Sequence, residues 1–156
     1  MPNWFYLFFN VLYHLGLAFW IGGALVLAAV VEPALFGALP RHEAIGIFAP
    51  ILRRFARLRV VALLLILIGA GAKFLIWERF DLAPWLAVRW AAIVLLAWAL
   101  LFDVLRTGRL MQLLAGVGPD VAPDDPRRQF NDVMHIHANG LMKASVIAAF
   151  LALLFS

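Results

Sequence analysis

The sequence contains no cysteine. This absence excludes disulfide bonds, thiolate metal ligands and a cysteine nucleophile. Charged residues are also scarce: 13 basic and 9 acidic side chains make up 14% of the 156 residues, and they leave a net charge of +4. So little charge, gathered in clusters along the chain, is not typical of a soluble domain.

Hydrophobic residues are abundant instead. They make up 65% of the chain, and the mean hydropathy is +0.95, whereas soluble domains contain roughly 45–50% apolar residues. This composition predicts a membrane protein, in which basic residues mark cytoplasmic loops and contact anionic lipid headgroups rather than nucleic acid. Because no Lys or Arg precedes the first apolar run, "NWFYLFFNVLYHLGLAFWIGG", we expect a retained span and not a cleaved signal peptide.

Four segments are long and apolar enough to cross about 30 Å of hydrocarbon. The sequence thus predicts an all-α integral membrane four-helix bundle that forms one transmembrane domain over residues 1–156, with spans at about 4–31, 60–77, 82–102 and 131–155. Pro33 should end or kink the first span. The third span should continue as a polar helix to Leu114, and the Gly/Pro/Asp-rich stretch "GVGPDVAPDDP" should form the one long loop before the last helix.

Arginine distribution predicts the orientation of the bundle. The connections between spans one and two and between spans three and four are rich in arginine, whereas the connection between spans two and three has Arg79 alone. The positive-inside rule then predicts a protein of the cell (inner) membrane with both termini on the non-cytoplasmic side.

The connection between the first two spans, "RHEAIGIFAPILRRFARLRV" (41–60), alternates apolar residues with arginines. This pattern favours an amphipathic helix along the cytoplasmic interface that then turns in as span two. Two functions are open: an anchor that sets topology, and a docking site for anionic lipid or a partner.

Ionisable residues within spans are expensive in lipid and are therefore candidate site residues. At about 100° per residue, the fourth span carries a polar seam along one helix face. His137 points about 160° away from His135, so "HIH" is a poor chelate for one metal ion on a helix. The seam favours either interhelical hydrogen bonds or a functional interior, and its members are Asp132, His135, Asn139 and Lys143.

A second group is predicted from depth in the outer half of the bundle. His14 lies about 15 Å and Lys143 about 18 Å inside the outer ends of their spans, so the two could meet near the midplane. The predicted group contains basic side chains and no acid, so it would form a cationic pocket. Such a pocket suits an anionic ligand: a haem propionate, a lipid phosphate or a quinone-like headgroup. The alternative is that the basic residues reach the headgroups or pair with Glu78 and Asp81. The group comprises Asn10, His14, Lys73, Arg89 and Lys143.

Several short motifs in the sequence resemble those of known membrane-protein families. "YHLGLAFWIGGALVLAAVVEPALFGALPRHEAIGIFAPILRRF" and "FNDVMHIHANGLMK" resemble a small four-span membrane family of unknown function typified by transmembrane protein 205. The shared features are a His in span one, a later Trp-x-Gly-Gly, a Pro near the end of that span and "LF..LPR". The first span is also similar to those of the copper-resistance D family and the HemJ-type protoporphyrinogen oxidases. The second resemblance implies that His14 associates with haem b, with Lys73 and Arg89 as loose candidates for the basic residues of that group.

The sequence leads us to expect a binding or accessory protein rather than an enzyme. It would hold a haem or another anionic amphiphile at His14, Lys73, Arg89 and Lys143, as a subunit of a larger membrane complex. Two alternatives stay open: a HemJ-like haem-b oxidoreductase, and a permease for copper or a small solute that uses the seam on span four.

Overall fold

The computed structural model describes residues 3–78, 83–114 and 126–156, and side chains over most of these ranges, excluding 106–114 and 126–139 among others. Every element in the described ranges is helical. The elements are α1 (Asn3–Val26), the π-helical η1 (Leu27–Val31), α2 (Glu32–Ala38), α3 (Arg41–Lys73), the π-helical η2 (Phe74–Glu78), α4 (Pro84–Leu114) and α5 (Pro126–Leu154).

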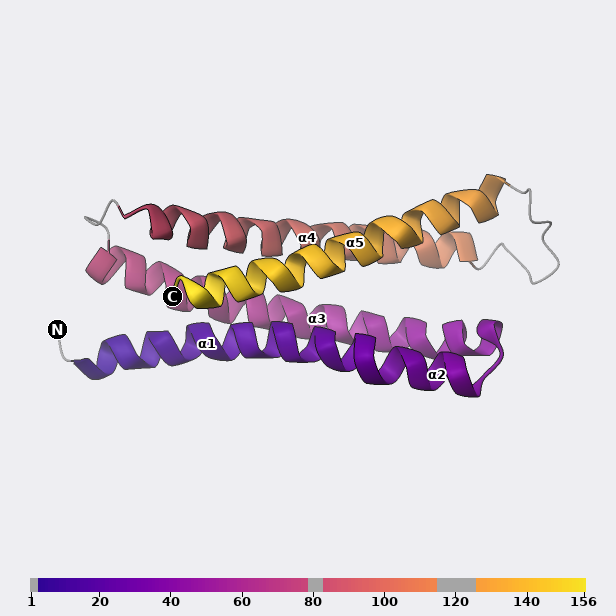
Figure 1. The fold of residues 1–156 in the computed structure, drawn as a ribbon, viewed down its shortest axis with the longest axis horizontal. Coiled ribbons are helices and arrows are strands. Elements are labelled where there is room, and N and C mark those ends of the chain that lie inside the picture. Colours follow the sequence, from indigo (N-terminus) through magenta and orange to yellow (C-terminus); the bar gives the residue numbers. More distant parts are fainter. Residues whose placement is uncertain (1–2, 79–82, 115–125) are drawn as a thin grey trace.

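These elements form an elongated bundle of four antiparallel rods (Figure 1). The first rod is α1 with η1 and α2, the second is α3 with η2, and α4 and α5 are the third and fourth. α1 packs against α3 and α5, and α4 packs against α5 and α3. We call the end that holds the start of α1, η2 and the start of α4 the N-terminal end of the bundle. α5 ends short of it, beside α1 (Figure 1).

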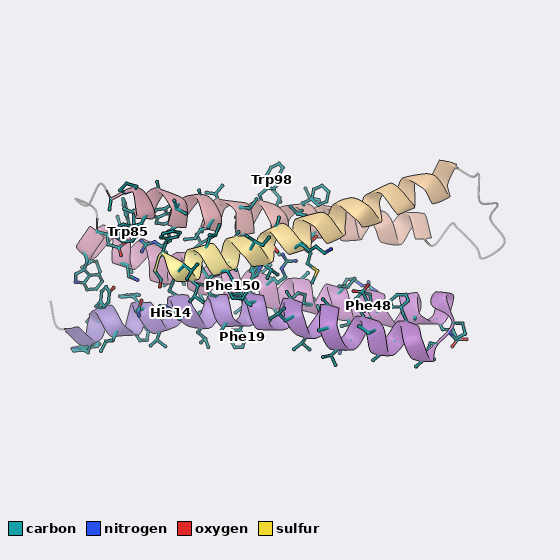
Figure 2. The ribbon with its side chains drawn as sticks, in the orientation of Figure 1. His14, Phe19, Phe48, Trp85, Trp98 and Phe150 are labelled. Atoms are coloured by element: carbon teal, nitrogen blue, oxygen red, sulfur yellow. The ribbon has the colours of Figure 1, made fainter. Side chains whose placement is uncertain are left out.

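Three of the described helical stretches are long and apolar enough to cross a membrane: Trp4–Ala38, Gly46–Glu78 and Pro84–Leu105. A shorter apolar helical stretch covers Gly140–Leu154. Large hydrophobic side chains also cover the outside of the bundle, where Phe19 and Trp98 point away from the neighbouring helices and are 42% and 60% exposed (Figure 2). Apolar residues on both the inside and the outside are what a bundle in lipid requires. The predicted all-α membrane bundle is therefore confirmed.

Pro33 lies in the first turn of α2, directly after η1, and does not end the first rod. Proline has no N–H to donate to the carbonyl one turn earlier, and the helix adapts by widening into η1, where the Glu32 N–H donates to the Leu27 carbonyl five residues before it. Such a π-bulge keeps the helix going. The first rod therefore does not end at about residue 31 but continues through α2 to Ala38.

The segment 41–59 also departs from its prediction. It does not form a separate interfacial helix that turns before span two, because α3 runs as one helix from Arg41 to Lys73 with Pro50 inside it. Its first turns pack along the first rod, as the contact between the Phe36 and Phe48 rings shows, with centroids 6.0 Å apart. The start of α3 thus lies alongside α2.

The last two helices border the segment 115–125, which lies outside the described residues. α4 extends beyond its apolar part to Leu114, and α5 starts at Pro126, where proline suits a helix start because its missing N–H needs no partner there. The loop "GVGPDVAPDDP" lies outside the described residues except for Pro126.

Glycines bring α1 and α3 close together. A Cβ atom on Gly16 would lie 2.6 Å from the Ala62 carbonyl oxygen, and one on Gly69 would lie 2.6 Å from the carbonyl oxygen of Phe9. Real Cβ atoms do not approach backbone atoms this closely, so both positions need glycine. Around this contact lies a core of large and small residues that includes Tyr13, Leu17, Trp20, Ile66, Leu96, Ala149 and Ala152.

We expect Gly69→Ala to destabilise the bundle although alanine is the better helix former. The added methyl would push α1 away from α3, and overpacking costs about 1–3 kcal/mol, against a gain in helix propensity of about 1 kcal/mol. Thermal unfolding in dodecyl maltoside, followed by circular dichroism, measures the effect. Gly71→Ala is the matched control on the same helix, because a Cβ there meets nothing within 4 Å. Equal unfolding temperatures for the two variants would contradict the close approach.

Candidate functional site

A polar cluster lies inside the N-terminal end of the bundle, where α1, α3 with η2, and α4 meet. Its described members are Asn10, Tyr13, His14, Lys73, Glu78 and Arg89. Each comes from an apolar stretch of helix, so its polar group must find partners within the protein. We refer to these six residues as the polar cluster.

Lys73 ends α3 and is 1% exposed. Its ammonium group donates to the Asn10 side-chain oxygen, with Nζ and Oδ1 2.9 Å apart. The same Nζ lies over two aromatic rings, 5.3 Å from the centroid of Tyr6 and 5.4 Å from that of Tyr13. Its direct contacts among the described residues are thus a neutral amide and two ring faces, which attract it less strongly than a paired carboxylate would.

Arg89 is fully buried, and its guanidinium faces Glu78. One nitrogen donates to Glu78 Oε1 over 3.1 Å and the other to Oε2, an arrangement that pairs a planar guanidinium with a carboxylate. The guanidinium also lies 5.3 Å from the Trp85 ring centroid. Its Nε is buried and has no hydrogen-bond partner among the described residues.

The predicted pocket without an acid is therefore corrected. η2 extends the second rod beyond Trp77 and places Glu78 against Arg89, whereas hydropathy alone ended this span at about residue 77. The Glu78 carboxylate also attracts the Lys73 ammonium and the Arg89 guanidinium repels it. The described cluster thus holds two basic side chains and one carboxylate, and the carboxylate pairs directly with Arg89. Asp81 lies outside the described residues.

His14 lies on α1 beside the end of α5 (Figure 2) and is partly buried. Its Nδ1 is 2.7 Å from the Asn10 carbonyl oxygen. A carbonyl can only accept, so Nδ1 carries the proton and, in the neutral ring, Nε2 keeps its lone pair. Nε2 lies 3.2 Å from the Ser156 hydroxyl. A histidine held this way, through Nδ1–H to a carbonyl, presents Nε2 as a potential metal ligand.

Asn10 and Tyr13 connect the cluster to the rest of the bundle. Asn10 accepts from His14 with its carbonyl and from Lys73 with its side chain. The Tyr13 hydroxyl donates to the Ala152 carbonyl over 2.6 Å and so links α1 to α5. His14 and Lys73 thereby share Asn10 as a partner, while Arg89 pairs with Glu78 at the same end of the bundle.

Lys143 does not join them. It is exposed. Ser156 contacts His14, and Lys143 precedes Ser156 by thirteen residues, so Lys143 lies about 20 Å from His14 along the direction of α5. The predicted meeting of His14 and Lys143 near the midplane is corrected for this reason: α5 ends beside His14 and does not reach the N-terminal end of the bundle. The other seam residues, Asp132, His135 and Asn139, have side chains outside the described part.

Sequence reasoning missed an ion pair in the other half of the bundle. Arg59, 4% exposed, pairs with Asp103, and its guanidinium lies 4.3 Å from the Trp20 ring centroid. The sequence analysis did not single out Arg59 from the neighbouring arginines. The available signal was position, since Arg59 directly precedes the apolar run of span two and Asp103 directly follows that of span three.

The described residues contain no group of three or more His, Asp or Glu side chains arranged to hold a metal ion. His137 and the rest of "MHIH" lie outside the described side chains, and the copper alternative stays a prediction.

The fold and the cluster define a helical membrane bundle with buried cations. Residues 15–115 of the chain match the family model described as "Domain of unknown function (DUF4149)". Since the match spans well over half of the 156 residues, the chain belongs to this family. The matched region includes Lys73, Glu78 and Arg89 but begins one residue after His14. No curated protein and no solved structure matches the chain.

Proposed function

We propose that this protein is an integral protein of the inner membrane that holds the anionic group of an amphiphile at the polar cluster. Its role is binding, as an accessory component of a larger membrane complex, and not catalysis. With the arginines of α3 on the cytoplasmic side, both termini and the polar cluster lie toward the non-cytoplasmic side.

The observation that carries the proposal is the environment of Lys73. An ammonium removed from water needs a counter-charge, because burial of an unpaired ion costs several kcal/mol. Glu78 already accepts from Arg89, and the direct acceptor of Lys73 is the neutral Asn10 amide. An anionic group brought in by a ligand would supply the missing charge.

Two further features support a carboxylate, phosphate or similar oxyanion as that group. The Arg89 Nε is a buried donor without a partner, and an unsatisfied buried donor costs about 1–3 kcal/mol. Tyr6 covers Lys73 and is itself 37% exposed. Since Tyr6 is the partly exposed member of the pair of rings over Lys73, an amphiphile can enter from the lipid by displacing one ring, with its chain left among the hydrophobic side chains outside.

We expect Lys73→Gln to remove the preference of the protein for an anionic ligand. The probes are 9,10-dibromostearate, with its carboxylate ionised, and its neutral methyl ester, both of which quench tryptophan fluorescence when their chains bind near Trp77 or Trp85. A hydrogen bond to a charged group contributes about 1.5–3 kcal/mol, so the wild-type protein should bind the acid about tenfold or more tightly than the ester. Glutamine can still hydrogen-bond to Asn10, which preserves the fold.

Arg57→Gln is the matched control, because Arg57 is exposed on the same helix, far from the polar cluster. It should keep the preference for the acid. The proposal fails if the wild-type protein binds acid and ester equally, or if the two variants lose the preference to the same extent.

Haem is a second candidate ligand, favoured by one observation: the Nδ1 hydrogen bond of His14 to Asn10 leaves Nε2 as an acceptor. These residues fit the group, because His14 would hold its iron and Lys73 a propionate. When bound, haem supplies redox and ligand-binding chemistry at its iron. The chain itself would orient the imidazole through Asn10 and neutralise the propionate through Lys73.

Haemin and metal-free protoporphyrin distinguish iron binding by His14 from propionate binding by Lys73, because protoporphyrin has the propionates but no iron. We expect haemin to give a Soret band that His14→Ala abolishes, whereas binding of protoporphyrin, followed by its fluorescence, should persist in His14→Ala and weaken several-fold in Lys73→Gln. Protein that stays colourless with haemin removes the haem candidate and leaves the fatty-acid measurement as the test of the anionic site.

A further inference from the structure

A groove lies on the outside of the bundle between α1 and α3, away from the polar cluster. Its volume is about 400 Å³, and it is lined from the first rod by Gly22, Gly23 and Val26 of α1 and Leu27 of η1, and from α3 by Ile51, Arg54, Phe55 and Leu58. One of these eight lining residues is charged, and none is acidic.

Two glycines open this groove. A Cβ on Gly23 would lie 2.3 Å from Phe55, so the Phe55 ring lies directly against the α1 backbone there. Gly22 is exposed, and a Cβ at this position would meet nothing within 4 Å. The groove is therefore an open space beside Gly22 with the Phe55 ring along its wall.

The basic side of the groove is also available to a ligand. Arg53, Arg54 and Arg57 are exposed, and of these Arg54 lines the groove. Arg59 is different: it is buried, pairs with Asp103 and contacts Trp20 and Phe55 from within the bundle. The exposed arginines of α3 keep their charge for an external partner, while Arg59 helps to hold the Phe55 wall in place.

We propose that this groove binds one anionic phospholipid of the leaflet in which the arginines lie. Its phosphate would pair with the Arg54 guanidinium, and part of an acyl chain would lie along Leu58 and Gly22, one turn further into the bundle. Charge complementarity selects this occupant, since a guanidinium binds phosphate bidentately and basic segments next to spans attract anionic lipids. An acyl chain is also the natural contact of the exposed apolar residues Val26 and Leu58.

Native mass spectrometry of the intact protein tests this site, with equal amounts of dioleoylphosphatidylglycerol and dioleoylphosphatidylcholine added to the detergent. The wild-type protein should retain the anionic lipid with a preference of about threefold to tenfold. Arg54→Gln should remove most of that preference by deleting the phosphate contact. Gly22→Leu should lower retention by filling the groove with a side chain that the space beside Gly22 accommodates.

Each variant has a matched control. Arg53→Gln deletes the same charge one residue away, outside the groove lining, and Gly37→Leu adds the same side chain at an exposed glycine of α2 with open space around it. Both should retain the anionic lipid as the wild type does.

Three results would overturn the site. Equal losses in Arg53→Gln and Arg54→Gln would mean that the arginines attract lipid only through bulk charge. Unchanged retention in Gly22→Leu would mean that no chain enters the groove. A dimer in the wild-type spectrum that Gly22→Leu abolishes would assign the groove to a second copy of the chain. Because neither Arg54 nor Gly22 belongs to the polar cluster, these results are independent of the anionic site at Lys73.

Discussion

Burial of cations within helices that face lipid is the constraint on which this structure depends. Arg59, Lys73 and Arg89 are all at most 4% exposed, and lipid offers them neither water nor counterions. Each is accommodated by the adjacent helices: Arg59 by Asp103 across α3 and α4, and Arg89 by Glu78 across α4 and η2. Lys73 differs from the other two, because its direct acceptor is a neutral amide on α1.

The way the helices pack makes these contacts available. Gly16 and Gly69 allow the α1 and α3 backbones to approach closely, so that Asn10 reaches Lys73 and the two tyrosine rings close over the ammonium. At the end of α3, the change to the wider η2 keeps Glu78 on the bundle near Arg89. Packing of small residues and the hydrogen bond of Lys73 are thus linked, because Asn10 on α1 reaches Lys73 on α3 where the two helices lie close together.

Much of this could be predicted from the sequence, because hydropathy and length define spans well. The helical class and the continuation of α4 to Leu114 follow from the apolar runs and their length. The placement of His14, Lys73 and Arg89 in the same half of the bundle follows from a rise of about 1.5 Å per residue. Hydropathy does not show how far a helix continues past its apolar part. For this reason the sequence assigned Glu78 to a loop and expected a turn before span two.

The errors in the candidate site have a related cause. Depth was counted from the ends of the spans as if all four were level, and α5 in fact ends beside His14, which removes Lys143 from the cluster. Position marks Arg59 and Asp103 as neighbours of their spans, but whether the two side chains face each other depends on the rotation of α3 about its axis, which packing with α1 sets. The contact of Lys73 with Asn10 likewise required the register that the glycines fix.

The central claim is that, among the described residues, the direct acceptor of Lys73 is a neutral amide and not a carboxylate. The most direct measurement is the thermal stability of ligand-free Asn10→Asp in neutral detergent, with Asn10→Leu as the reference for loss of the hydrogen bond. A carboxylate at position 10 would replace the neutral acceptor of the Lys73 ammonium by a charged one, worth about 1–2 kcal/mol more, so the unfolding temperature should rise by several degrees above wild type, whereas Asn10→Leu should lower it. An unfolding temperature of Asn10→Asp at or below that of Asn10→Leu would show that the charge of Lys73 is already balanced, and would contradict the account.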